Sequence, residues 1–189
     1  MTKNRILLLA NYRTGSSDYC DTLSKINNAT FLPEPHLYEE KYRLLKKIVF
    51  AGEPFVVKFM PDQIAEHPIY VKILNSNCYK IKLTRENKID QITSYYIAYM
   101  TKIWNSTDVL ARGENYTVEI SHEKIIKAID MISKNDSIFN TLDIKFDEEL
   151  TYEHLVDNNL LGRRLVKILE PSNISDIKKA VEDVYHNRQ

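Results

Sequence analysis

Cysteine, net charge and long apolar runs are all scarce in this chain, and each scarcity excludes a class of protein. Cys20 and Cys78 lie far apart and without a metal-binding spacing, so we expect two free thiols rather than a disulfide. No apolar stretch is long enough to span a bilayer, and residues 6–10 are too few for the core of a signal peptide. We therefore expect a cytoplasmic protein without a membrane partner.

The charges balance, with 26 Lys and Arg residues against 26 Asp and Glu residues. A chain without net charge has no bulk attraction to nucleic acid, so we expect no nucleic-acid partner, and anion binding must come from local clusters. The length of 189 residues is typical of one domain with a sizeable core, and we expect a single domain over 1–189.

Short apolar segments alternate along the chain with segments of helical period. The segments predicted as strands are 5–10, 29–32, 55–59, 79–83 and 142–146. The segments predicted as helices are 16–26, 38–51, 61–74, 89–104, 121–139, 152–160 and 174–185. This alternation favours an α/β fold with a mainly parallel sheet of about four or five strands and helices on both faces. Residues 105–120 lack any period and are a candidate loop or lid.

The first predicted strand runs directly into a loop of small hydroxyl residues. The loop reads Arg13-Thr14-Gly15-Ser16-Ser17 and leads into a predicted helix. Such a junction points backbone N–H groups and a helix N-terminus at one spot, and Arg13 adds a cation beside this candidate anion site. An ordinary strand-to-helix turn favours the same residue types. The loop lacks the Lys of a Walker A sequence, which argues against ATP-driven phosphoryl transfer.

A second cationic position follows the fourth predicted strand. The strand ends at Thr84-Arg85, and Ser94 lies nine positions after Arg85 in the next predicted helix. The carboxyl ends of strands are where open α/β sheets bind ligands, so Arg85 and Ser94 can hold one phosphate through a guanidinium fork and a hydroxyl. The alternative is that Arg85 pairs with Glu86 or Asp90 and that Ser94 only packs.

Together these motifs resemble the sulfotransferases that use 3′-phosphoadenosine 5′-phosphosulfate (PAPS), especially the bacterial and glycan-directed branches. Residues 13–17 are similar to the family's [KR]-[ST]-G-[ST]-[ST] loop, which holds the 5′-phosphosulfate. Arg85, Asp90 and Ser94 are similar to its 3′-phosphate motif, with one extra residue between Arg and Ser. Tyr152 lies in a stretch similar to the family's Y-E-D-L element near the adenine.

The resemblance implies a P-loop-NTPase-like three-layer fold and an enzyme that moves a sulfuryl group from PAPS to a hydroxyl. The acceptor hydroxyl would belong to a small molecule or a glycan, and no metal would be required. By this resemblance, Arg13 stabilises the charge on the leaving oxygen, since a guanidinium does not readily donate its proton. Thr14, Gly15, Ser16 and Ser17 would hold the 5′-phosphosulfate.

The general base has two candidates in the turn after the second predicted strand. Many glycan-directed sulfotransferases place a Glu-Pro pair at this point, and the resemblance makes Glu34 the first choice. His36 is the alternative, since other branches use a histidine whose pKa lies near neutrality. A purely structural interpretation assigns Pro33 and Pro35 to a solvated turn in which Glu34 is incidental.

The chain also departs from the family pattern. It is shorter than most sulfotransferases, and the nearest match to their late basic, Gly-rich loop is Gly162-Arg163-Arg164, which equally fits a helix C-cap. Two other functions therefore stand beside sulfuryl transfer. One is a sulfotransferase-like protein that binds the nucleotide without turnover, and the other is a small nucleotide or sugar kinase with a degenerate P-loop.

Overall fold

The computed structural model of the chain describes residues 4–64, 66–104, 116–161 and 170–188. The chain divides into two compact units. The first comprises Met1–Glu86 and Asn135–Gly162, and the second comprises Asn87–Lys134 and Arg163–Gln189.

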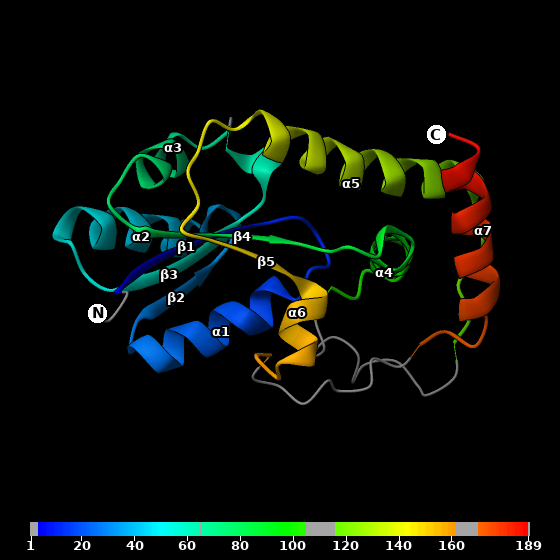
Figure 1. The fold of residues 1–189 in the computed structure, drawn as a ribbon, viewed down its shortest axis with the longest axis horizontal. Coiled ribbons are helices and arrows are strands. Elements are labelled where there is room, and N and C mark those ends of the chain that lie inside the picture. Colours follow the sequence, from blue (N-terminus) through cyan, green and yellow to red (C-terminus); the bar gives the residue numbers. More distant parts are fainter. Residues whose placement is uncertain (1–3, 65, 105–115, 162–169, 189) are drawn as a thin grey trace. The chain divides into compact units, whose positions relative to one another are not determined.

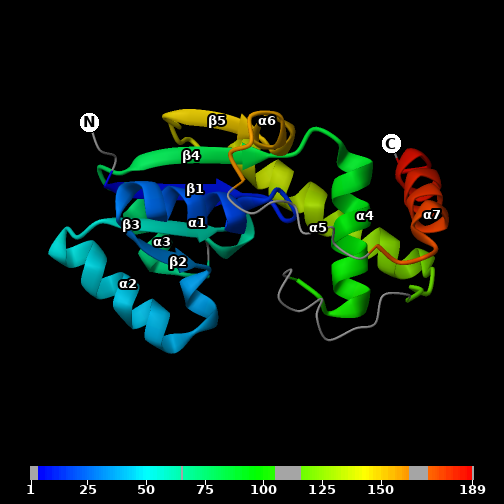
Figure 2. The ribbon, with the colours of Figure 1, turned by 90° about the horizontal axis from the view of Figure 1, so that it is seen from below.

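The first unit contains a parallel sheet, five-stranded among the described residues, in the order β2-β3-β1-β4-β5. Figure 2 shows these strands side by side in that order. The central strand β1 pairs with β3 on one side and with β4 on the other. The sheet confirms the α/β class with a parallel sheet. The strands are β1 Arg5–Ala10, β2 Thr30–Pro33, β3 Phe55–Phe59, β4 Tyr79–Thr84 and β5 Glu148–Thr151.

Helices cover both faces of this sheet because its strands alternate apolar side chains between two clusters. Helices α1 (Ser16–Asn27) and α6 (Tyr152–Asp157) pack on one face. That cluster holds Ile6, Leu8, Ala10, Tyr19, Cys20, Val56, Ile81, Leu83 and Leu155. Figure 1 shows both helices on the same side of the strands.

The opposite face is covered by α2 (Glu39–Ala51), by α3 (Pro68–Leu74) and by the last turns of α5 (His122–Thr141), which belong to the first unit from Asn135 onward. Their cluster holds Leu7, Leu9, Leu32, Leu45, Ile48, Phe55, Val57, Phe59, Ile69, Tyr70, Ile73, Leu74, Cys78 and Phe139. The result is a three-layer arrangement of helices, sheet and helices. Cys20 and Cys78 are free and buried, one in each apolar cluster.

The chain leaves two neighbouring strands toward opposite faces of the sheet. After β1 it forms α1 on one face, and after β3 it forms the short η2 (Pro61–Gln63) and then α3 on the other. Ligands of open α/β sheets bind at the carboxyl ends of the strands where the connections diverge in this way. The carboxyl ends of β1 and β3, together with the adjacent end of β4, are therefore the expected ligand site of this fold.

Two element boundaries differ from the sequence expectation. The fifth strand lies at Glu148–Thr151 rather than at 142–146. Leu142, Ile144 and Phe146 do alternate toward the core, but this stretch is not a strand. Periodicity indicates which residues are buried, whereas a strand also needs backbone pairing with a neighbouring strand. The segment that pairs with β4 is β5 at Glu148–Thr151. The predicted helix over 61–74 divides into η2 and α3, with Pro68 as the first residue of α3.

The second unit contains α4 (Lys88–Thr101), the first part of α5 and α7 (Ile174–His186). Lys178 Nζ in α7 lies 2.6 Å from Asp90 Oδ1 in α4, which ties these helices together. The candidate lid falls mostly outside the described residues, which resume at 116, and residues 116–120 there form neither helix nor strand. Within the described residues, each helix is too short or too polar to cross a membrane.

Candidate functional site at the carboxyl ends of the strands

The loop after β1 holds two residues in the left-handed backbone region. Arg13 has φ 60° and Gly15 has φ 70°, and Gly15 is the N-cap of α1. Because Gly15 has no side chain, it gives α1 no side-chain cap, and its carbonyl instead accepts the N–H of Tyr19 at 3.1 Å. Non-glycine residues with positive φ are uncommon and concentrate at functional sites. This backbone is suited to presenting N–H groups to an anion.

The hydroxyls of the loop have different surroundings. Thr14 is fully buried, and its hydroxyl donates to the Asn11 carbonyl at 2.9 Å, which closes the loop. In this arrangement Thr14 offers a ligand its backbone N–H rather than its hydroxyl proton. Ser16 is buried at the first position of α1. Ser17 Oγ accepts a hydrogen bond from Lys58 Nζ at 3.0 Å, so that its own proton can still point toward a ligand.

Arg85 lies against this loop although it is 72 positions away in the sequence. Its Nη1 donates to the Arg13 carbonyl at 3.3 Å, and its guanidinium carbon lies 4.5 Å from the centre of the Tyr152 ring. The loop, the end of β4 and the start of α6 thus meet at one place. Thr151 caps α6 by accepting the N–H of His154, which fixes the position of Tyr152 in the first turn.

The electrostatics of this place favour an anion. Burial, followed by the neighbouring Arg85, lowers the pKa of the Arg13 guanidinium from its ordinary value. The shift arises because a partly desolvated cation beside another cation is disfavoured. An anion placed at both arginines relieves this repulsion and accepts charge-assisted hydrogen bonds.

Gly15 is also required by close packing. A Cβ added at this position lies 3.1 Å from Tyr152 Cδ2, and its φ of +70° strains any side chain. Gly52 shares the positive φ of +75° but has nothing within 4 Å of an added Cβ. We expect Gly15→Ala to destabilise the fold by about 1 kcal/mol more than Gly52→Ala, as measured by urea unfolding. Equal losses of unfolding free energy in the two variants would show that the Tyr152 side chain moves aside at no cost.

Glu34 and Lys58 form an ion pair next to the loop. Glu34 Oε1 lies 2.6 Å from Lys58 Nζ, and the Glu34 N–H donates to the Lys58 carbonyl at 2.9 Å. The Lys58 side chain is 4% exposed and the Glu34 side chain 20% exposed. Glu34 also has a positive φ of 42°. Lys58 therefore connects Ser17 of the loop to Glu34 in the turn after β2.

Sequence reasoning missed Lys58. The available signal was its place within Phe55–Phe59, a strand that is otherwise apolar and buried at every position. Lys is almost never fully buried unless it is paired, so a lysine in such a strand indicates a partner at the end of the sheet. Alternation places Val56 and Lys58 on the α1 side of the sheet, which is the side of Ser17.

His36 lies in η1 (Pro35–Leu37) and packs in an aromatic cluster rather than beside the loop hydroxyls. Its Nδ1 lies 2.6 Å from the Tyr70 hydroxyl, and its ring centre is 4.6 Å from that of His67. Burial, followed by the nearby His67, lowers the pKa of His36, and Lys58 acts in the same direction. Glu34 and Glu66 act in the opposite direction. The two base candidates thus have different neighbours, an ammonium for Glu34 and a histidine and a tyrosine for His36.

The lowered pKa of His36 gives stability a pH dependence. The unfolded chain binds a proton at His36 more readily than the folded chain, so this contribution is complete above the ordinary His pKa of 6.5. It is lost as the pH falls from 6.5 through the lower folded value. We expect the free energy of unfolding in urea to decrease between pH 7.5 and 5.5, and to decrease less in His36→Gln. An identical decrease in the variant would assign the effect to other groups.

The other predicted residues do not belong to the described part of the first unit. Ser94 lies on α4 in the second unit, whereas Arg85 belongs to the first. Gly162, Arg163 and Arg164 lie outside the described residues. Among the residues that are described, no group of three His, Cys, Asp or Glu side chains is arranged to hold a metal ion. Comparison of the chain with protein-family models and with curated proteins finds no match in either.

Proposed function

We propose that this protein is a sulfotransferase that moves a sulfuryl group from PAPS to a hydroxyl of a small molecule or a glycan. The observation that supports this most is the contact between Arg85 and the loop at 13–17. Its 3.3 Å hydrogen bond to the Arg13 carbonyl brings two guanidinium groups, the N-terminus of α1 and Tyr152 to one end of the sheet. Such a cluster suits a nucleotide that carries phosphates at two ends.

In this proposal Arg13 and Arg85 bind opposite ends of the nucleotide. The N–H groups of residues 14–17 and the Ser17 hydroxyl hold the 5′-phosphosulfate, and Arg13 stabilises charge on the bridging oxygen. Lys58 donates to Ser17 Oγ and so orients this hydroxyl. Arg85 holds the 3′-phosphate. Tyr152 packs against Gly15 and lies 4.5 Å from the Arg85 guanidinium, and in this proposal its ring lies beside the nucleotide.

Glu34 is the proposed base. It removes the proton of the acceptor hydroxyl as the acceptor oxygen bonds to sulfur, while the bond from sulfur to the 5′-phosphate oxygen breaks. The electron pair of that bond leaves with 3′-phosphoadenosine 5′-phosphate (PAP). The ion pair with Lys58 at 2.6 Å and the contact from Gln63 Nε2 at 3.4 Å hold the carboxylate in one orientation. A fixed base is what positioned proton transfer requires.

Calorimetric titration with PAP tests the proposal directly. We expect saturable binding in the micromolar range without added metal, and weaker binding of adenosine 5′-phosphate. Absence of PAP binding at millimolar concentration would overturn the proposal. Preferential binding of ATP in the presence of Mg²⁺ would favour a kinase instead, and PAP binding without transfer across a panel of hydroxyl acceptors would indicate a binding protein.

A further inference from the structure

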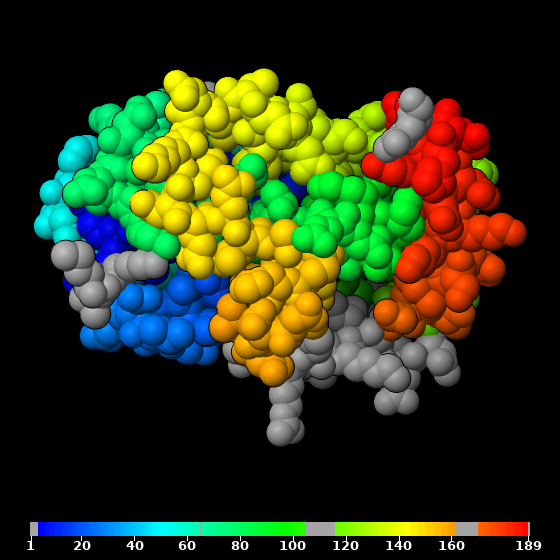
Figure 3. Space-filling model, viewed as in Figure 1, coloured from blue at the N-terminus to red at the C-terminus, as the bar shows by residue number. Residues whose placement is uncertain are grey.

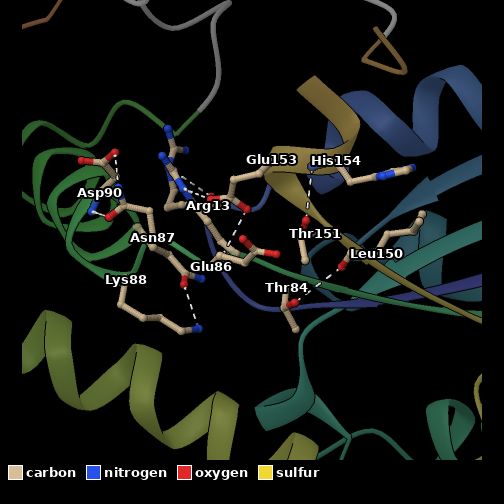
Figure 4. A network of polar contacts seen from close by, with 12 residues as sticks. Arg13, Thr84, Glu86, Asn87, Lys88, Asp90, Leu150, Thr151, Glu153 and His154 are labelled. Atoms are coloured by element: carbon tan, nitrogen blue, oxygen red, sulfur yellow. Dashed lines mark hydrogen bonds and ion pairs between the residues drawn. The ribbon is translucent and has the colours of Figure 1, made fainter. Parts of the chain in front are cut away.

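Arg85 has an acidic neighbour that the proposed function does not use. Glu153 lies in the first turn of α6, directly after Tyr152, and its Oε1 is 3.9 Å from Arg85 Nε. Its other oxygen, Oε2, accepts the backbone N–H of Glu86 at 3.1 Å. Figure 4 shows the Glu153 side chain reaching from α6 to the end of β4. The Glu153 carboxylate therefore faces the residue proposed to hold a phosphate.

The contact between these two side chains is loose. At 3.9 Å there is no hydrogen bond, and Arg85 Nε is a buried donor without an acceptor in the described part of the chain. The Arg85 side chain is 14% exposed and the Glu153 side chain 31% exposed. A largely buried guanidinium usually gains a bidentate partner, whereas among the described residues the Nε edge of Arg85 has only the 3.9 Å ion pair with Glu153. The geometry is that of a cation with a resident but replaceable counter-ion.

A phosphate bound at Arg85 must share this cation with the Glu153 carboxylate. The negative charges of the phosphate and of the carboxylate would repel each other, and this repulsion is stronger where water is partly excluded. Two features anchor the first turn of α6, which carries Glu153: Thr151 caps the helix, and Leu155 is fully buried. In Figure 3 the β5–α6 segment (yellow to orange) lies on the surface of the first unit.

We propose that Glu153 is the internal counter-ion of Arg85 and sets the selectivity of this position between a phosphate monoester and a hydroxyl. The inference rests on the proposed function in that it takes the 3′-phosphate as the group at Arg85. The carboxylate lowers affinity for the dianionic phosphate but accepts a hydrogen bond from a ribose hydroxyl without penalty. Glu153 is thus a specificity residue that acts on the ligand at Arg85.

The test compares Glu153→Gln with Glu149→Gln. Glutamine keeps an acceptor for the Glu86 N–H and removes only the charge. Glu149 also lies at this sheet edge and pairs with a cation, Lys82 at 3.1 Å, but it is 64% exposed. By calorimetry we expect Glu153→Gln to bind PAP about 10-fold more tightly and adenosine 5′-phosphate unchanged, while Glu149→Gln alters neither. The inference would be overturned if the ratio of PAP affinity to adenosine 5′-phosphate affinity in Glu153→Gln were equal to or lower than that in the wild type.

Inorganic phosphate separates this inference from the proposed function. We expect phosphate to raise the melting temperature of Glu153→Gln more than that of the wild type, and the gain to vanish in the Arg85→Ala, Glu153→Gln double variant. If the wild type fails to bind PAP but this pattern holds, sulfuryl transfer fails and the counter-ion role stands. If PAP binds but phosphate stabilises both proteins equally, the counter-ion role fails and the proposed function stands.

Discussion

Arg85→Ala is expected to weaken the binding of PAP about 30- to 100-fold, as measured by isothermal titration calorimetry. A guanidinium–phosphate fork contributes about 2 to 2.7 kcal/mol. Because the Arg85 side chain is only 14% exposed, water compensates little for its loss. Adenosine 5′-phosphate, which lacks the 3′-phosphate, should lose much less affinity. The difference between the losses of affinity for the two nucleotides therefore measures the contribution of Arg85 to binding of the 3′-phosphate.

Two further variants serve as controls for this result. Arg43→Ala removes an exposed arginine on α2 that pairs with Glu39, and we expect no change in affinity. Arg85→Lys keeps the charge but loses the fork and the donor to the Arg13 carbonyl, so an intermediate loss is expected. If Arg85→Ala weakens both nucleotides equally, Arg85 supports the loop rather than the 3′-phosphate, and the assignment is wrong.

Glu34→Gln is expected to lower the rate of sulfuryl transfer about 100- to 1000-fold, while the affinity for PAP changes less than about threefold. Loss of a positioned general base has an effect of this size, and the amide cannot accept the acceptor proton. Release of PAP from PAPS in the presence of a panel of hydroxyl acceptors measures the rate. Glu39→Gln, five positions later and 76% exposed, is the matched control and should turn over as the wild type does.

The same substitution also removes one partner of the pair with Lys58, so loss of the fold must be separated from loss of the base. Breaking a buried ion pair is destabilising, and the partial exposure of Glu34 reduces the cost to about 1 to 3 kcal/mol. Urea unfolding measures this directly. A Glu34→Gln variant that is folded and binds PAP but turns over normally would exclude Glu34 as the base, and His36→Gln would then test the alternative.

Local patterns in the sequence were sufficient to predict much of the fold. The apolar run of β1, the loop at residues 13–17 and the helix after it follow from short-range preferences, and the structure has β1 and α1 almost as predicted. The alternation of strands and helices correctly indicated a parallel sheet. Even the misplaced fifth strand followed a real pattern, because Leu142, Ile144 and Phe146 are directed toward the apolar cluster.

The sequence by itself determined the α/β class, the loop after β1 and the presence of charged residues at strand ends. Only the tertiary structure decided which of these residues meet. Lys58 joins Ser17 across 41 positions and Arg85 joins the loop across 72, and no local pattern identifies the partner in either contact. The physical reason is that periodicity records how each segment is buried, whereas a hydrogen bond or ion pair depends on strand order, which brings β3 and β4 to either side of β1.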